Sequence, residues 1–347
     1  MKNSEYKKVL VTGGLGFIGS HTVVELLDEG FDVLILDDLS NSSIAVLDQI
    51  NKISNKRPLF EKLDLKDKKG VQELFLKHND ISGVIHFAAS KAVGESVVKP
   101  LEYYENNLVP LINLLQEAEK INRSFSFIFS SSCTVYGQAD QLPITEEAPI
   151  KKAESPYGNT KQIGEEILWD TVQSNDNLNV VALRYFNPIG AHESLEIGEL
   201  PIGTPQNLIP FLTQTAAGIH DKLNVFGDDY PTLDGTCIRD YIHVVDLAKA
   251  HVVALKRLKE EKQNESFEIF NLGTGKGSSV LEVIKTFERV SGEKLNYEIT
   301  ARRDGDIVEA YADTSKANNV LGWKATLSLA QGIKSAWDWE KKIRNKS

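Results

Sequence analysis

The chain has 347 residues, of which 41% are hydrophobic and 25% charged, which is typical of a folded globular protein and excludes a disordered or collagen-like chain. Its 39 basic and 49 acidic side chains give a formal net charge of -10, which disfavours nucleic acid as a partner. No apolar run approaches the length of a membrane span, and the first residues lack a signal-peptide core. We therefore expect a cytoplasmic protein that makes no membrane contact.

The first 190 residues alternate short β-branched or aromatic runs with longer helical patterns. Strands are predicted over residues 8–12, 31–37, 59–63, 84–87, 125–129 and 180–184. Helices are predicted between them, over residues 18–29, 67–78, 101–121 and 157–173. Strands separated by helices indicate repeated β-α-β units, and nearly continuous apolar strands are typical of a buried parallel sheet. The expected fold class is therefore α/β, with a Rossmann-type doubly wound parallel sheet.

The pattern changes in the second half of the chain. Residues 188–240 are rich in Gly, Pro and Asp and contain few periodic segments. Further on, helices are predicted over residues 246–258, 280–290 and 327–342, and a strand over residues 267–271. We expect a dinucleotide-binding domain at residues 1–187, with a return segment near 241–271. Residues 188–240 and 272–347 are expected to form a smaller C-terminal α/β lobe that binds the substrate.

A glycine-rich turn follows the first predicted strand. Gly13, Gly16 and Gly19 form a G-x-x-G-x-x-G pattern, in which a side chain would hold the backbone away from a pyrophosphate at the helix N-terminus. Asp37 follows Gly19 by 18 residues, near the position of an acid that binds ribose hydroxyls. Because Asp37 and Asp38 would repel a 2′-phosphate, the sequence favours NAD over NADP. A tight structural turn and a helix-capping aspartate would give the same letters.

A second pattern combines serine, tyrosine and lysine. Tyr157 and Lys161 are four residues apart at the start of a predicted helix, so they share one face. A nearby ammonium is expected to lower the pKa of Tyr157 from its usual value of about 10, which makes it a candidate general base. A serine from the run Ser130, Ser131 and Ser132 could hold the substrate oxygen. Taken alone, such a pair is more often a surface feature, but its position after the glycine turn favours catalysis.

Several longer motifs make the sequence recognisable. They are T-G-G-x-G-F-I-G from Thr12, S-S-S-x-T-V-Y-G from Ser130, S-P-Y-G-x-T-K from Ser155 and R-Y-F-N-P-x-G-A-H from Arg184. Together they resemble the extended short-chain dehydrogenase/reductase family. Segments at residues 86–96, 100–107, 235–244 and 301–306 resemble, more narrowly, the UDP-glucose 4-epimerase family. The resemblance extends from about residue 8 to the final predicted helix.

The resemblance implies reversible C4 epimerisation of UDP-hexoses through a transient 4-keto sugar, with tightly bound NAD as cofactor. It also implies a homodimer formed through residues 101–121 and 157–173. The implied catalytic residues are Ser132, Tyr157 and Lys161. The implied NAD-binding residues are Gly13, Gly16, Phe17, Ile18, Gly19, Asp37, Asn41, Ser42, Asp64, Leu65, Phe87, Ala88, Lys91, Asn106, Tyr157, Lys161 and Tyr185. The implied UDP-sugar contacts are Ser132, Asn187, Asn207, Leu208, Phe226, Arg239, Arg303, Asp306 and Ala310.

Three of these positions bear on specificity. Arg239 and Arg303 suit a diphosphate, because planar guanidinium groups bind such anions in a bidentate way. Ala310 stands where the family has either a bulky tyrosine or a small residue beside the 2-substituent of the sugar. We therefore expect UDP-GlcNAc and UDP-GalNAc to be interconverted as well as UDP-glucose and UDP-galactose. The seven histidines and two cysteines show no metal-ligand spacing, so no metal is expected.

Two other kinds of protein are alternatives to the epimerase. A nucleotide-sugar 4,6-dehydratase, or another enzyme of the extended family such as a uronate epimerase, would have the same fold. Dehydratases carry an Asp-Glu pair directly after the catalytic Ser or Thr, whereas this chain has Cys133 and Thr134 there. A non-catalytic NAD-binding regulator would have lost the Tyr or the Lys, and both are present. The sequence therefore favours the epimerase.

Overall fold

The computed structural model describes residues 7–303 and 306–345, and the chain divides into two compact units. Unit 1 consists of Met1–Gly137, Ile150–Arg184 and Ala248–Phe270. Unit 2 consists of Gln138–Pro149, Tyr185–Leu247 and Asn271–Ser347. Among the described residues, we find no helix with both the length and the apolar character that crossing a bilayer requires.

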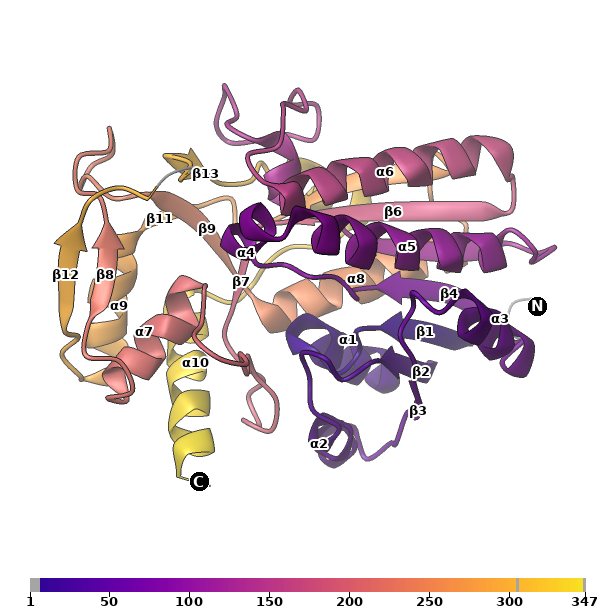
Figure 1. Cartoon of the computed structure of the whole chain (residues 1–347), viewed down its shortest axis with the longest axis horizontal. Helices are drawn as coiled ribbons and strands as arrows, with labels where there is room; N and C mark the ends of the chain where they lie inside the picture. Colours follow the sequence, from indigo (N-terminus) through magenta and orange to yellow (C-terminus); the bar gives the residue numbers. More distant parts are fainter. Residues whose placement is uncertain (1–6, 304–305, 346–347) are drawn as a thin grey trace. The chain divides into compact units, whose positions relative to one another are not determined.

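Unit 1 is built on a seven-stranded sheet (Figure 1). In spatial order its strands are β10 (Phe267–Leu272), β6 (Leu178–Tyr185), β5 (Phe125–Ser130), β4 (Ile81–His86), β1 (Lys8–Thr12), β2 (Asp32–Asp37) and β3 (Leu59–Lys62). The pairings from β3 through to β6 are parallel. Both faces of β4 and β5 are buried, as expected of central strands in a doubly wound sheet. The predicted fold class is confirmed.

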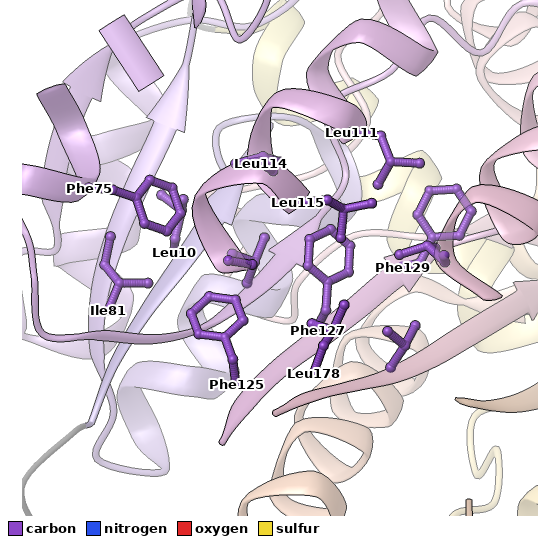
Figure 2. Close-up of a cluster of buried hydrophobic side chains, with 14 of the residues drawn as sticks. Leu10, Phe75, Ile81, Leu111, Leu114, Leu115, Phe125, Phe127, Phe129 and Leu178 are labelled. Atoms are coloured by element: carbon purple, nitrogen blue, oxygen red, sulfur yellow. The ribbon is translucent and has the colours of Figure 1, made fainter. Parts of the chain in front are cut away.

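One face of this sheet carries a large apolar core. Three helices cover it: α3 (Lys68–Lys77), α5 (Pro100–Ala118) and α6 (Pro156–Ser174). Figure 2 shows Leu114 and Leu115 of α5 above the aromatic side chains Phe125 and Phe127 of β5. Phe125 and Phe127 alternate along β5 with residues that point to the opposite face of the sheet, as the two-residue period of a strand requires.

The other face is covered by α1 (Phe17–Asp28) and α8 (Val244–Lys259). A Cβ built on Gly83 of β4 would lie 3.4 Å from Leu255 of α8, so this helix packs directly on the strand. An ion pair between Lys256 and Glu29 links α8 to the end of α1. Two short helices, α2 (Ala45–Ser54) and α4 (Val93–Val98), and the 3₁₀ turn η1 (Cys133–Tyr136) complete the helical elements of this unit.

The strand order fixes where a ligand can bind in unit 1. The chain moves outward from β1 to β2 and β3, and then returns to β4 on the other side of β1. Ligands of such sheets bind beyond the carboxyl ends of the strands at this point of reversal. Gly13 and Ala88, which follow β1 and β4, are so close there that a Cβ on Gly13 would lie 2.9 Å from the Ala88 nitrogen.

Unit 2 contains two small sheets and its own core. One sheet joins β7 (Asn187–Ile189), β9 (Ile238–His243), β11 (Gly277–Ser279) and β13 (Glu309–Ala310), and the other pairs β8 (Leu223–Phe226) with β12 (Tyr297–Thr300). The helices are α7 (Leu208–Ala216), α9 (Val280–Ser291), the π-helical turn η2 (Ala317–Leu321) and α10 (Leu329–Arg344). Phe287 of α9 and Trp337 of α10 pack edge to face at the centre of the core, with ring centroids 5.5 Å apart.

The observed units differ from the expected domains at residues 138–149, 185–187, 241–247 and 271. Residues 138–149 belong to unit 2 because the Ile144 nitrogen donates to the Tyr311 carbonyl and the Glu146 carboxylate accepts from the Asn271 nitrogen. Residues 241–247 also belong to unit 2, because β9 pairs with β7 and Asp246 accepts hydrogen bonds from Thr326. Such long-range bonds leave no local signal in the sequence.

Candidate active site

The glycine turn after β1 forms a close-packed backbone cradle. Gly13 has a φ of +65°, which favours glycine, and Gly16 is the N-cap of α1. A Cβ on Gly19 would lie only 2.2 Å from the Gly13 carbonyl oxygen. The turn therefore excludes side chains where a pyrophosphate would approach the N-terminus of α1, and these residues fit a dinucleotide.

Asp37 organises the loop beyond this turn. Its carboxylate accepts hydrogen bonds from the Leu15 nitrogen at 3.1 Å, the Leu39 nitrogen at 3.0 Å and the Ser42 hydroxyl at 2.7 Å. It does not cap the next helix, because α2 has Ile44 as its N-cap. The carboxylate thus ties the glycine turn to the loop after β2, and its position at the end of β2 suits ribose recognition.

A cavity of about 450 Å³ lies beyond the ends of β2 and β3. Its lining residues are Asp38, Lys62, Leu63, Asp64 and Asp67. Asp64 is a predicted NAD contact, and its carboxylate orients the following turn by accepting from the Lys66 nitrogen at 2.9 Å. The cavity thus lies at the carboxyl edge of the sheet, next to the predicted NAD contact Asp64.

The other predicted NAD contacts lie in several segments of the chain. Phe87 and Ala88 follow β4, and both nitrogens are bonded to Thr12 of β1. Asn106 lies on α5 and donates to the Ser90 hydroxyl at 2.9 Å, whereas Lys91 is exposed in the loop before α4. Of the remaining contacts, Phe17 and Ile18 lie at the start of α1, Asn41 in the loop after β2, Leu65 after β3 and Tyr185 at the end of β6, in unit 2.

The start of α6 presents Tyr157 and Lys161 on its buried face. Ser155 caps this helix by accepting from the Gly158 nitrogen, and Pro156 occupies its first turn. Tyr157 is 8% exposed and Lys161 is 4% exposed. The Lys161 nitrogen is 5.9 Å from the centre of the Tyr157 ring.

The Lys161 ammonium is held among few polar partners. Its nitrogen donates to the Ser130 carbonyl at 2.7 Å and lies 5.0 Å from the centre of the Phe129 ring. Burial lowers the pKa of Lys161 to about 8, against the raising effect of the Glu165 carboxylate. Burial, together with the Lys161 charge, lowers the pKa of His86 to about 3, so this neighbouring imidazole stays neutral near pH 7.

The three serines at residues 130–132 make different hydrogen bonds. Ser130 bonds Lys161 through its carbonyl, and Ser131 donates through its hydroxyl to the Glu165 carboxylate at 2.5 Å. Ser132 is the N-cap of η1, where its hydroxyl accepts from the Thr134 nitrogen at 3.2 Å. A Cβ on Gly158 would lie 3.3 Å from the Thr134 carbonyl oxygen, so η1 packs against the first turn of α6.

A buried ion pair that was not predicted from the sequence lies behind these residues. Glu165 accepts from Arg184 of β6 at 2.9 Å and 2.5 Å, and both side chains are buried. The spacing of Glu165 could have revealed it, because Glu165 follows Lys161 by the same four residues that separate Lys161 from Tyr157. All three therefore share one face of the helix. For Arg184 no spacing rule applies, because it lies on β6, 19 residues after Glu165, and its motif does not show which residue it pairs with.

Unit 2 brings three of the predicted UDP-sugar contacts together. The Arg303 guanidinium lies 5.3 Å from the centre of the Phe226 ring and donates to the Asp306 carboxylate at 2.7 Å. Phe226 ends β8 and is 38% exposed, so it offers an aromatic face beside a positive charge. Such a pair suits a planar base and a diphosphate.

The remaining contacts of unit 2 lie on strands and at a helix start. Arg239 and Ala310 are register partners on β9 and β13, and Asn187 lies on β7, which pairs with the same strand β9. Asn207 is the N-cap of α7, and Leu208 is its first residue. The Asn207 amide donates to Glu199 at 3.2 Å.

Within the described parts of both units, no three His, Cys, Asp or Glu side chains cluster as metal ligands.

Known proteins resemble this chain over nearly its whole length. The family model described as GDP-mannose 4,6 dehydratase matches residues 10–336. A UDP-glucose 4-epimerase of Erwinia amylovora is 47% identical over 332 residues, which cover 96% of this chain and 97% of the relative. The chain belongs to the UDP-glucose 4-epimerase family.

Solved structures of this family superpose closely on the chain. A UDP-glucose 4-epimerase of Stenotrophomonas maltophila, with bound NAD and formylated UDP-arabinopyranose, has a TM-score of 0.94 and 44% identity, and the match covers 98% of this chain and 100% of that one. An enzyme of Bifidobacterium longum in complex with NAD⁺ and UDP has a TM-score of 0.92 and 47% identity, over 98% and 100% of the two chains.

The glycine cradle makes a testable prediction for Gly19→Ala. Because the new Cβ would overlap the Gly13 carbonyl, the turn must shift, and we expect NAD that co-purifies with the protein to fall at least ~10-fold. NAD released by denaturation, per mole of chain, measures this. Gly94→Ala on α4 is the matched control, because its Cβ would meet nothing within 4 Å. Equal NAD content in both variants would contradict the assigned role of the turn.

Proposed function

We propose that the protein is an NAD-dependent isomerase that inverts C4 of UDP-hexoses and interconverts UDP-glucose and UDP-galactose. The observation that carries this conclusion is the buried Tyr157–Lys161 face of α6, in the same unit as a glycine cradle that fits a dinucleotide. Membership of the UDP-glucose 4-epimerase family supports it. The 4,6-dehydratase alternative is weaker, because Cys133 and Thr134 after Ser132 supply no carboxylate pair for the elimination of water.

Residues of unit 1 would hold the cofactor. The turn at Gly13, Gly16 and Gly19 would take the pyrophosphate, and Asp37 would accept hydrogen bonds from the ribose hydroxyls. The cavity bordered by Asp64 would take the adenine. When bound, NAD⁺ supplies the acceptor for the hydride that leaves C4 of the sugar and later returns it.

The proton of the sugar 4-hydroxyl needs a base, and Tyr157 is the residue proposed for it. The positive charge of Lys161, whose nitrogen lies 5.9 Å from the Tyr157 ring centre, stabilises the phenolate that accepts this proton. The Ser132 hydroxyl would hydrogen-bond the sugar oxygen. Because the same phenol gives the proton back after the sugar has presented its other face, acid and base roles alternate on one side chain.

Residues of unit 2 would bind the UDP part of the substrate. Phe226 would stack on the uracil, and Arg303 and Arg239 would bind the diphosphate. The Arg303 guanidinium is paired with Asp306 and over half of its side chain is exposed, so the cation is accessible. Firm binding of the nucleotide is useful because the sugar itself must turn during inversion, and its own contacts cannot be tight.

The substrate range is proposed to include UDP-GlcNAc and UDP-GalNAc. Ala310 is a small side chain on β13 that lies beside Arg239 of β9, one of the residues proposed for the diphosphate. A methyl group at this position occupies far less volume than a tyrosine would. The space gained suits the N-acetyl group at C2 of the sugar.

A homodimer is proposed from the apolar surface of two helices. Helices α5 and α6 pack on each other and carry exposed apolar side chains, among them Leu101, Ile112 and Trp169. Such a surface supports the expected homodimer.

A cytoplasmic location is proposed for the protein. Cys133 and Cys237 form no disulfide in the described structure, which is in keeping with that location.

Replacement of Tyr157 tests the proposed function. Purified protein is incubated with UDP-galactose without added NAD, and UDP-glucose is separated and quantified. We expect the wild type to form UDP-glucose and Tyr157→Phe to lose ~10²–10⁴-fold in kcat, because the phenylalanine cannot accept the proton. UDP affinity, measured by calorimetry, should change less than about threefold, because the chemistry and not the nucleotide contact is removed.

Tyr297→Phe serves as the control for this experiment. Tyr297 is 40% exposed on β12, outside both sets of predicted site residues, and the same hydroxyl is removed. Its kcat should equal that of the wild type. A wild type without epimerase activity would contradict the proposed function, and full activity in Tyr157→Phe would contradict the assignment of the base.

The size of residue 310 makes a separate prediction. The wild type should convert UDP-GalNAc as well as UDP-galactose, and Ala310→Tyr should lose about 100-fold in kcat/KM for UDP-GalNAc only. Ala310→Ser, which stays small, should keep both activities. A wild type that does not convert UDP-GalNAc, while Ala310→Tyr remains active on UDP-galactose, would show that the space beside Ala310 does not decide the substrate range.

A further inference from the structure

Behind the catalytic face of α6, four buried side chains form one polar cluster. The Glu165 carboxylate accepts from the Arg184 Nε at 2.9 Å and from the Arg184 Nη2 at 2.5 Å. It also accepts from the Ser131 hydroxyl at 2.5 Å. The remaining Arg184 nitrogen donates to the Tyr136 hydroxyl at 2.9 Å, and the guanidinium lies 4.8 Å from the centre of the Tyr136 ring.

Three members of this cluster are close in sequence to a residue proposed for the chemistry. Ser131 immediately precedes Ser132. Glu165 lies one helical turn after Lys161 and two turns after Tyr157, on the same face of α6. Tyr136 ends η1, the turn that Ser132 caps. The Glu165 carboxylate therefore links the segment that carries Ser132 to the helix that carries the Tyr–Lys pair, alongside the Lys161 bond to the Ser130 carbonyl.

Stability alone is a weak reason for such a cluster. Glu165 and Arg184 are 7% and 3% exposed, so both charges have left water. Desolvation of a buried ion pair commonly cancels its Coulomb attraction, and well-packed apolar side chains would be as stable or more stable. Unlike apolar side chains, the ion pair makes directional hydrogen bonds. The carboxylate and the guanidinium therefore hold their partners at fixed angles.

The cluster also acts on the charge of Lys161. The titratable groups that face this ammonium are Tyr157 and Glu165 from α6 and His86 from β4. His86 is neutral near pH 7, whereas the Glu165 carboxylate raises the pKa of Lys161 against the effect of burial. Removal of that negative charge would lower the pKa of Lys161 further below its present value of about 8.

We propose that Glu165 is a positioning residue for the epimerase reaction: locked by Arg184, its carboxylate sets Ser131, and through it Ser132, against the Tyr157–Lys161 face of α6. Glu165 does not touch the substrate in this role. It acts through the geometry of the serine turn and through the charge state of Lys161. The inference rests on the proposed function.

Two variants separate these effects. Glu165→Gln keeps the size of the side chain but removes its charge, and we expect kcat for UDP-galactose to fall ~10- to 100-fold, because small misplacements of reacting groups have effects of this size. The alkaline limb of its kcat–pH profile should move to lower pH, since Lys161 would lose its proton more readily. Ser131→Ala removes only the hydroxyl, so it should lower kcat about tenfold without moving the limb.

The readouts distinguish positioning from a general loss of structure. KM for UDP-galactose and UDP affinity should stay within about threefold of the wild type in both variants, because the UDP contacts are unchanged. Glu166→Gln is the matched control: it makes the same substitution one residue along α6, on an exposed side chain, and should leave kcat and the pH profile unaltered. Circular dichroism and thermal melting report whether each variant is folded.

The possible outcomes decide the proposal. Glu165→Gln with wild-type kcat and pH profile overturns it. If Glu165→Gln does not fold, because Arg184 is left buried without its partner, Ser131→Ala decides: a reduced kcat at unchanged KM supports the proposal, and an unchanged kcat overturns it. The wild-type assay is run first, since an inactive wild type contradicts the proposed function itself and the inference falls with it.

Discussion

The proposed chemistry depends on one buried ammonium. Lys161 is 4% exposed, and burial opposes its charge strongly enough to lower its pKa to about 8. The Ser130 carbonyl, the Phe129 ring and the Glu165 carboxylate compensate for lost water, and each comes from an element that also shapes the site. The seven-stranded sheet and α6 therefore hold a cation beside Tyr157 that water would otherwise surround and screen.

Much of the fold follows from local patterns in the sequence. β1 was predicted with the bounds that the structure shows, and α9 and α10 within two residues, because strand and helix periods are clear there. The elements between residues 188 and 240 were missed. β7 has three residues and β8 has four, which is too short for a period to show, and both are fixed by partners distant in the chain.

In the candidate site, too, local motifs could be found in the sequence, whereas contacts between distant elements could not. The glycine turn and the Tyr157–Lys161 pair could be located from the sequence because each is a short motif with fixed spacing at the start of one helix. The Glu165–Arg184 pair could not, because it joins α6 to β6 and its partners meet only after the sheet has formed. Arg303 was predicted from its motif, but its pairing with Asp306 and its place on the Phe226 ring are results of the tertiary structure.

The most direct test of the account is the kcat of Lys161→Met for UDP-galactose, normalised to bound NAD. Methionine has a similar length and no charge, so the variant removes the ammonium while the helix can remain packed. The account predicts a loss in kcat of about 10²-fold or more, with UDP affinity little changed. A kcat within threefold of the wild type at equal NAD content would contradict it, because Tyr157 would then work without the cation.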